Sequence, residues 1–225
     1  MLQKAFTLLE IVFVIVIIGI ISAVMAPRVK RATMDEMAHQ VISDIMYTQQ
    51  LALNDNKFDP KDSSWYKKRW QIFFSYTKAG CKDASWTYTI FSDKNKDANP
   101  NSSEIAKNPL NPSQYLSGGY GGSVPYCSAG GIVSKKITKK MNLTNKYDIQ
   151  SIVFKGGCAT NKLRIYFDYL GRPMYSNPKY LIDKYHEKGN INRLVQNECD
   201  IILTNKAGES RTIVITPETG YVYMK

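Results

Sequence analysis

Oxygen-bearing side chains between positions 93 and 104 have the spacing of a twelve-residue calcium-binding loop. They stand at its first, third, fifth, ninth and twelfth positions: Asp93, Asn95, Asp97, Asn101 and Glu104. Carboxylate and amide oxygens at these positions are the ligands that Ca²⁺ takes in such loops. Ala98 stands where that loop has a glycine for its sharp turn. The segment is therefore either a calcium site or a solvated loop of Asn and Asp.

Two basic clusters could contact phosphate groups. They contain seven cationic residues: Lys67, Lys68, Arg69, Lys135, Lys136, Lys139 and Lys140. The first cluster is flanked by Trp65, Tyr66 and Trp70, whose rings could stack on bases. The formal net charge of +11 favours anionic partners such as nucleic acid or anionic lipid. DNA binding is thus one hypothesis, and a solvated lysine surface is the other.

The four cysteines carry no metal or redox spacing. Cys81, Cys127, Cys158 and Cys199 are widely separated, and no two of them form a C-x-x-C pair. Their even number favours two disulfides in an oxidising compartment over buried thiols. Pairing neighbours in the sequence gives the shorter loops, so we predict Cys81–Cys127 and Cys158–Cys199, with crossed pairs as the alternative.

Catalytic chemistry has little support in this sequence. The two histidines, His39 and His186, belong to no hydrolase or metal motif. The glycine-rich stretch 118–122 lacks the strand and helix signals of a nucleotide-binding loop. We therefore expect a protein that is not an enzyme and has no cofactor beyond a possible calcium ion.

A long apolar segment precedes all of these residues. Residues 6–26 are interrupted only by Thr7, Glu10, Gly19 and Ser22, and at ~1.5 Å per residue they span about 30 Å. This length predicts a transmembrane helix. Glu10 is costly inside such a helix. Its carboxylate either lies at the level of the lipid headgroups or pairs with a positive charge of another subunit.

The start of the chain resembles the signal of type IV prepilins. The residues that carry the resemblance are Lys4-Ala5-Phe6-Thr7-Leu8-Leu9-Glu10, followed by the apolar run 11–21. The resemblance implies cleavage between Ala5 and Phe6 by a prepilin peptidase and methylation of the Phe6 amine. It also implies that Glu10 takes part in assembly, and that Pro27 lies where pilin helices often carry a proline. Ala5 departs from the glycine usual before the cleavage site.

The rest of the chain predicts a helical stem and a β-rich domain. Met37, Val41 and Ile45 recur at four-residue spacing, which predicts an amphipathic helix. Alternating apolar runs beyond it are typical of half-buried strands. Three segments, 86–93, 167–173 and 213–220, are similar to patterns in H-type minor pseudopilins and related minor pilins. This second resemblance implies a sandwich-like β domain on the stem.

The expected fold class is α+β, with a long N-terminal transmembrane and stem helix packed on a mainly antiparallel, sandwich-like C-terminal domain. The expected divisions are a leader at 1–5, a helix at 6–56 (6–26 transmembrane, 27–56 stem) and a β domain at 57–225. That domain contains an excursion rich in Gly, Asn and Pro at about 95–134.

The resemblance implies a minor pseudopilin or pilin of a type II secretion or type IV pilus-like machine, which polymerises through its N-terminal helix. Its partners would be other pilin subunits, the prepilin peptidase and the inner membrane. The expected location is the bacterial inner membrane, single-pass with a periplasmic C-terminal domain, and then the pilus or pseudopilus. The alternative function is a tip minor pilin that binds DNA for uptake or acts in adhesion.

Overall fold

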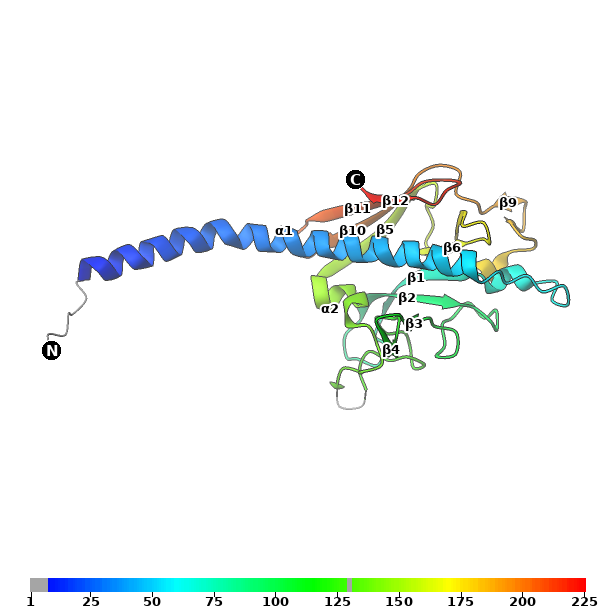
Figure 1. Cartoon of the computed structure of the whole chain (residues 1–225), viewed down its shortest axis with the longest axis horizontal. Coiled ribbons are helices and arrows are strands. Elements are labelled where there is room, and N and C mark those ends of the chain that lie inside the picture. The colour runs from blue at the N-terminus through cyan, green and yellow to red at the C-terminus, as the bar shows by residue number, and fades with distance from the viewer. Residues whose placement is uncertain (1–7, 129–130) are drawn as a thin grey trace.

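A single long helix and two antiparallel sheets dominate the computed structural model (Figure 1). The structure describes residues 8–128 and 131–225, without the side chains of 23–32. Helix α1 covers Leu8–Asn54. In Figure 1 its second half lies across the β-rich part of the chain, and its first half projects beyond it.

Both sheets have four antiparallel strands. The first has the order β2-β1-β6-β7, with β1 (Trp70–Thr77), β2 (Ser85–Ser92), β6 (Arg164–Phe167) and β7 (Pro173–Tyr175). The second has the order β12-β11-β10-β5, with β5 (Ile149–Gly156), β10 (Cys199–Asn205), β11 (Ser210–Ile215) and β12 (Val222–Met224). The predicted mainly antiparallel β structure is confirmed.

Short elements connect the two sheets. Two-stranded sheets are formed by β3 (Lys107–Asn108) with β4 (Asn111–Tyr115) and by β8 (His186–Glu187) with β9 (Ile191–Asn192). The short helices are η1 (Trp65–Lys68), η3 (Lys139–Met141), α2 (Leu143–Tyr147) and η4 (Pro178–Tyr180). The Asn142 side chain caps α2 by accepting from the Asn145 backbone N–H at 3.0 Å.

One face of α1 forms the centre of the core. Its buried apolar residues are spaced so that they share one side of the helix: Met34, Met37, Ala38, Val41, Ile45 and Ala52. The same cluster contains inward-facing residues of both sheets, among them Phe74 of β1 and Phe154 of β5, whose ring centroids are 5.8 Å apart. A helical stripe facing two pleated surfaces buries apolar area on both, so the helix holds the sheets together.

The excursion at about 95–134 covers the outer face of the first sheet. A second hydrophobic cluster there joins Phe91 of β2 to Ile105, Val124 and Ile137. Gly118 lies where this segment passes close to Met141: a Cβ on Gly118 would be 2.2 Å from the Met141 carbonyl oxygen. Only glycine fits this approach.

Both predicted disulfides are confirmed. Cys81 is bonded to Cys127, and Cys158 is bonded to Cys199. The first attaches the excursion to the loop after β1, and the second ties the end of β5 to the start of β10. Each closes a loop of more than 40 residues, which contributes stability of roughly 2 to 4 kcal/mol.

The predicted transmembrane element requires a correction. Across the residues that the structure describes, no helix combines the length and the apolar character needed to cross a bilayer. The expected fold class is therefore wrong in its transmembrane helix. The expected single-pass location in the inner membrane depended on that helix and is wrong as well.

We predict that Gly118→Ala destabilises the protein by about 2 kcal/mol or more, because the new methyl group overlaps the Met141 carbonyl. Gly122→Ala is the matched control, since a Cβ there meets nothing within 4 Å. Denaturant unfolding of both variants measures the difference. Equal stabilities would show that the close approach at Gly118 does not exist.

Candidate functional site

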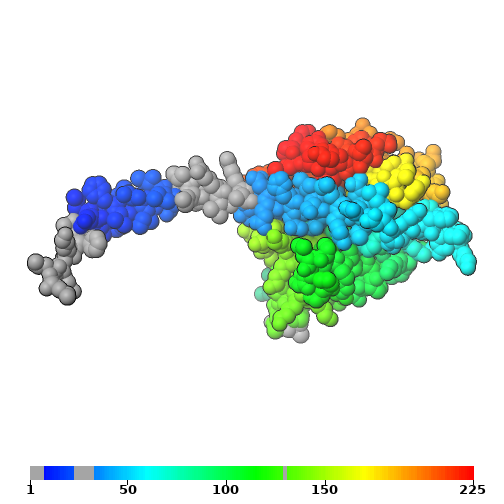
Figure 2. Space-filling view, viewed as in Figure 1, coloured from blue at the N-terminus to red at the C-terminus, as the bar shows by residue number. Residues whose placement is uncertain are grey.

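The first turns of α1 expose an unusual amount of apolar surface. Twelve large apolar side chains there are exposed: Leu8, Leu9, Ile11, Val12, Phe13, Val14, Ile15, Val16, Ile17, Ile18, Ile20 and Ile21. We call residues 8–21 the N-terminal apolar segment. Figure 2 shows the described part of this segment, in dark blue, well beyond the β-rich part.

The exposed side chains of this segment surround the helix. Consecutive residues from Ile11 to Ile18 are all apolar and all between 50% and 63% exposed. A water-facing helix of a globular protein has an apolar stripe on one side only, whereas a helix that is apolar all round is covered in its working state. An exposed apolar surface of this extent marks an interaction site.

Glu10 is the acidic residue in the first turn of α1. A carboxylate is favourable there because it faces the positive end of the helix dipole. The predicted cleavage site, Ala5 and Phe6, lies outside the described residues. Pro27 falls within the bounds of α1, but its side chain is also outside the described part.

The sequence did not reveal a polar contact that fixes α1 on the first sheet. The Tyr88 hydroxyl of β2 donates to the Asp44 carboxylate at 2.6 Å, and Gln40 donates to the same carboxylate at 3.0 Å. Burial raises the pKa of Asp44, and the bonds from Tyr88 and Gln40 oppose that rise. The position of Asp44 between Val41 and Ile45 on the apolar stripe was the signal that could have identified it.

The predicted calcium residues close their own loop by hydrogen bonds. Asp93 accepts from the backbone N–H groups of Asp97 at 3.1 Å and Ala98 at 2.9 Å. Glu104 accepts from the Asn95 backbone at 3.0 Å and from the Asn101 side chain at 2.6 Å. Asp93 and Glu104 are both buried. Their carboxylates therefore stabilise the loop by accepting hydrogen bonds from its own N–H groups.

Ala98 makes the sharp turn that the sequence pattern assigned to a glycine. Its φ is +77°, a left-handed conformation that costs energy for a residue with a Cβ. In the described ranges, 8–128 and 131–225, no group of three or more His, Cys, Asp or Glu side chains could hold a metal ion. Calcium binding by the predicted set, Asp93, Asn95, Asp97, Asn101 and Glu104, stays a prediction.

The two basic clusters have different environments. Arg69 is buried, and its Nη1 donates to the Lys184 carbonyl at 2.6 Å. Lys68 forms an ion pair of 2.7 Å with Asp62, and Lys67 is half-buried. Within this first cluster the Arg69 guanidinium therefore packs inside the domain, while Lys67 and Lys68 stay partly accessible. DNA binding through this cluster stays a prediction.

The second basic cluster is at the surface. Lys135, Lys136, Lys139 and Lys140 are all exposed. Lys140 lies 3.5 Å from Glu36 of α1, an exposed pair that contributes little stability. This cluster remains available to an anionic partner, and DNA binding there stays a prediction.

The two histidines lie in different surroundings. His39 is exposed on α1. The His186 ring nitrogen Nδ1 lies 3.1 Å from Asp183, which also accepts the His186 backbone N–H. This contact is local and shapes the turn before β8.

Comparison of the chain with models of protein families, with curated proteins and with solved structures found no match.

We predict that Asp93 makes stability depend on pH between about 4 and 6. Burial, reinforced by Glu104 and Asp97, raises the pKa of Asp93 to about 6. Because the folded state binds this proton more tightly than the unfolded state, the contribution to stability is present below about pH 4 and is lost as pH rises through about 6.

The free energy of unfolding, measured by denaturant titration at several pH values, tests this prediction. Asp93→Asn should flatten the profile over this interval, whereas Asp183→Asn, at an exposed turn, should not.

We also expect millimolar calcium to leave the melting temperature unchanged, since an ion that bound the folded state would raise it. A clear calcium-dependent rise in the melting temperature would show that the folded state binds calcium.

Proposed function

We propose that this protein is a non-enzymatic pilin-like subunit, a minor pseudopilin or minor pilin of a type II secretion or type IV pilus-like machine. The observation that carries the proposal is the N-terminal apolar segment, which exposes apolar side chains around its whole circumference. Such a surface needs a cover of similar character, and helices of other pilin subunits supply one. The prepilin-like residues at the start of the chain support the same assignment.

The continuity of α1 gives the segment a mechanical role. The same helix that exposes residues 8–21 buries Val41 and Ile45 in the core of the β-rich domain. Packing of the segment against neighbouring helices therefore holds the domain at a set position in the assembly. Two disulfides suit an exported domain that must stay folded outside a reducing compartment.

The prepilin resemblance assigns the remaining roles. A prepilin peptidase would cleave between Ala5 and Phe6, and the methylated amine of Phe6 would become the new start of the helix. Glu10 would then pair with the amine of an adjacent subunit and set the register between helices. No described group suggests that the domain itself catalyses a reaction.

We predict that Val16→Glu abolishes co-purification of the tagged chain with other pilin subunits from its source cell in mild detergent. The new carboxylate would be buried among apolar side chains without a partner, which costs several kcal/mol. The measurement is the amount of each pilin recovered, identified by mass spectrometry.

Ile182→Glu is the matched control, because Ile182 has a comparable exposure of 61% but lies on the β-rich domain. It should co-purify as the unmodified chain does. Loss of the pilins with Ile182→Glu, or their retention with Val16→Glu, would contradict assembly through the N-terminal apolar segment.

We predict that Glu10→Gln leaves cleavage between Ala5 and Phe6 intact but reduces co-purification with partner pilins. The amide keeps the size of the side chain and removes the charge that would attract a neighbouring amine. The mass of the mature chain reports cleavage, and recovery of pilins reports assembly. Normal recovery together with normal secretion or uptake would rule out an assembly role for Glu10.

A further inference from the structure

A polar cavity lies between the turn at Ala98, the start of β6 and η4. Its volume is about 370 Å³, within the range of small-ligand sites. Three cationic side chains line it: Arg164, Lys162 and Lys179. Arg164 begins β6, Lys162 lies just before it and Lys179 lies on η4, so the turn of the chain between these two elements brings the three cations to one cavity.

Arg164 is a buried cation at this cavity. Only 3% of the residue is exposed. Its Nη1 donates to the Gln71 side chain at 2.8 Å and its Nη2 to the Ala98 carbonyl at 2.9 Å. Its guanidinium carbon lies 4.0 Å from the centre of the Phe73 ring. Burial lowers the pKa of Arg164 to about 10, so it is charged at neutral pH.

One donor of this guanidinium is unused. The Arg164 Nε is buried and has no hydrogen-bond partner among the groups that the structure describes. A buried donor without an acceptor costs about 1 to 3 kcal/mol. An oxyanion in the cavity could supply that acceptor after a shift of the Arg164 side chain, because Nε itself is buried. Its charge would also compensate the buried cation.

The two lysines add mobile positive charge at the rim. Both are exposed. The Lys179 ammonium lies 3.4 Å from the Asp97 carbonyl oxygen, and the Lys162 ammonium lies 5.7 Å from the centre of the Tyr180 ring. Each can therefore turn toward a ligand in the cavity without breaking a strong ion pair of its own.

Two carboxylates oppose this positive charge. Asp97 lines the cavity, and its oxygens already accept from the Asn99 backbone at 2.7 Å and the Asn95 side chain at 3.1 Å. Asp93 interacts electrostatically with Arg164. Its carboxylate accepts the Ala98 backbone N–H at the turn. Among the residues that line the cavity, three are cationic and one, Asp97, is acidic. Asp93 and its neighbour Glu104 lie outside the lining and accept hydrogen bonds from the loop.

The remaining lining is suited to a sugar. Asn99, Asn161 and Asn177 contribute amide side chains, which both donate to and accept from hydroxyl groups. Tyr180 and Phe73 contribute aromatic surface. In such a cavity the cations can bind an acidic group and the amides can bind hydroxyl groups. The aromatic rings can pack against the apolar face of a sugar ring.

We propose that this cavity binds an acidic sugar, a monosaccharide unit that carries a carboxylate, sulfate or phosphate group. Arg164 holds the oxyanion, Lys162 and Lys179 close over it, and the amides contact the hydroxyl groups. This site does not depend on the assembly role proposed above.

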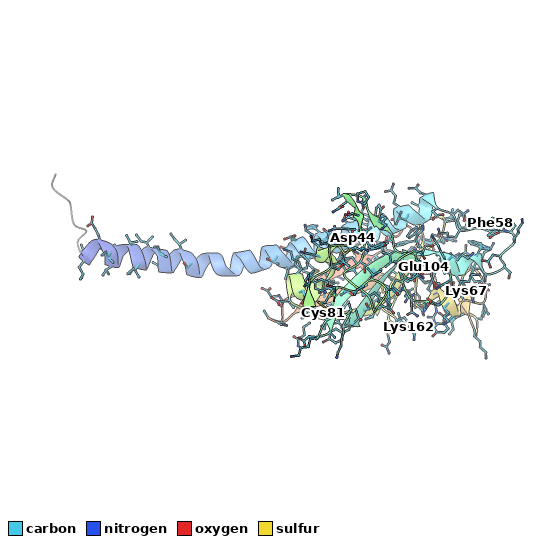
Figure 3. All side chains as sticks on the ribbon, turned by 90° about the horizontal axis from the view of Figure 1, so that it is seen from below. Asp44, Phe58, Lys67, Cys81, Glu104 and Lys162 are labelled. Carbon is cyan, nitrogen blue, oxygen red and sulfur yellow. A yellow bond between two sulfur atoms is a disulfide. The ribbon has the colours of Figure 1, made fainter. Side chains whose placement is uncertain are left out.

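The position of the cavity leaves it accessible in an assembly built on α1. Ile72 and Phe74 of β1 face the core that contains α1, so Phe73 and its neighbour Arg164 on β6 lie on the opposite face of the sheet. In Figure 3, Lys162 lies at the edge of the domain away from Asp44, which is on α1. An acidic sugar could therefore reach the site from outside.

The test is calorimetric titration of the full chain in mild detergent with galacturonic acid, a sulfated glucose and a phosphorylated glucose. Neutral glucose and inorganic phosphate are titrated in parallel. At least one acidic sugar should bind more tightly than both comparators. The double variant Lys162→Gln with Lys179→Gln should weaken that binding about 10-fold or more, a change of ~1.4 kcal/mol.

Lys82→Gln with Lys155→Gln is the matched control, since it removes two exposed lysines elsewhere and the same net charge. It should bind as the unmodified chain does. Absence of binding by all three acidic sugars would overturn the proposal. Equal binding of glucose or inorganic phosphate, or equal losses in the two double variants, would also overturn it.

Discussion

The apolar stripe on the second half of α1 is the constraint on which the rest of the structure depends. Two four-stranded sheets pack on this stripe, and polar contacts fix the helix at both ends of the contact. Arg211 of β11 donates to Asp35 at 2.6 Å, and Gln49 donates to the carbonyls of Gly171 and Thr219, each at 2.8 Å. A shift of α1 along its axis would break these bonds and the Asp44–Tyr88 bond together, so the helix has one register on the domain.

The first half of the same helix has no such cover in the described part of the chain. One continuous helix that joins a buried stripe to an exposed apolar segment suits a subunit whose domain is positioned by helix packing elsewhere. The cavity at Arg164 lies on the face of the first sheet away from α1. A ligand there and a partner on the N-terminal apolar segment would therefore occupy separate parts of the molecule.

Four-residue spacing at Val41 and Ile45, a local pattern, predicted the buried stripe. The preference for the shorter loops predicted both disulfides, although their cysteines are 46 and 41 residues apart. The predicted membrane span was not borne out over the described residues. Features made by distant segments could not be predicted. The burial of Arg69 depends on Lys184, more than 100 residues later, and the cavity at Arg164 joins segments about 65 to 90 residues apart.

The central claim is that the N-terminal apolar segment contacts the helices of other pilin subunits. Site-specific photo-cross-linking in the source cell tests it most directly, with a photoreactive amino acid at position 17, where Ile17 is 53% exposed, and a control at position 182. We predict cross-links from position 17 to the N-terminal helices of pilin subunits, identified by mass spectrometry, and none from position 182. Cross-links to pilins from position 182 alone, or from neither position, would contradict the claim.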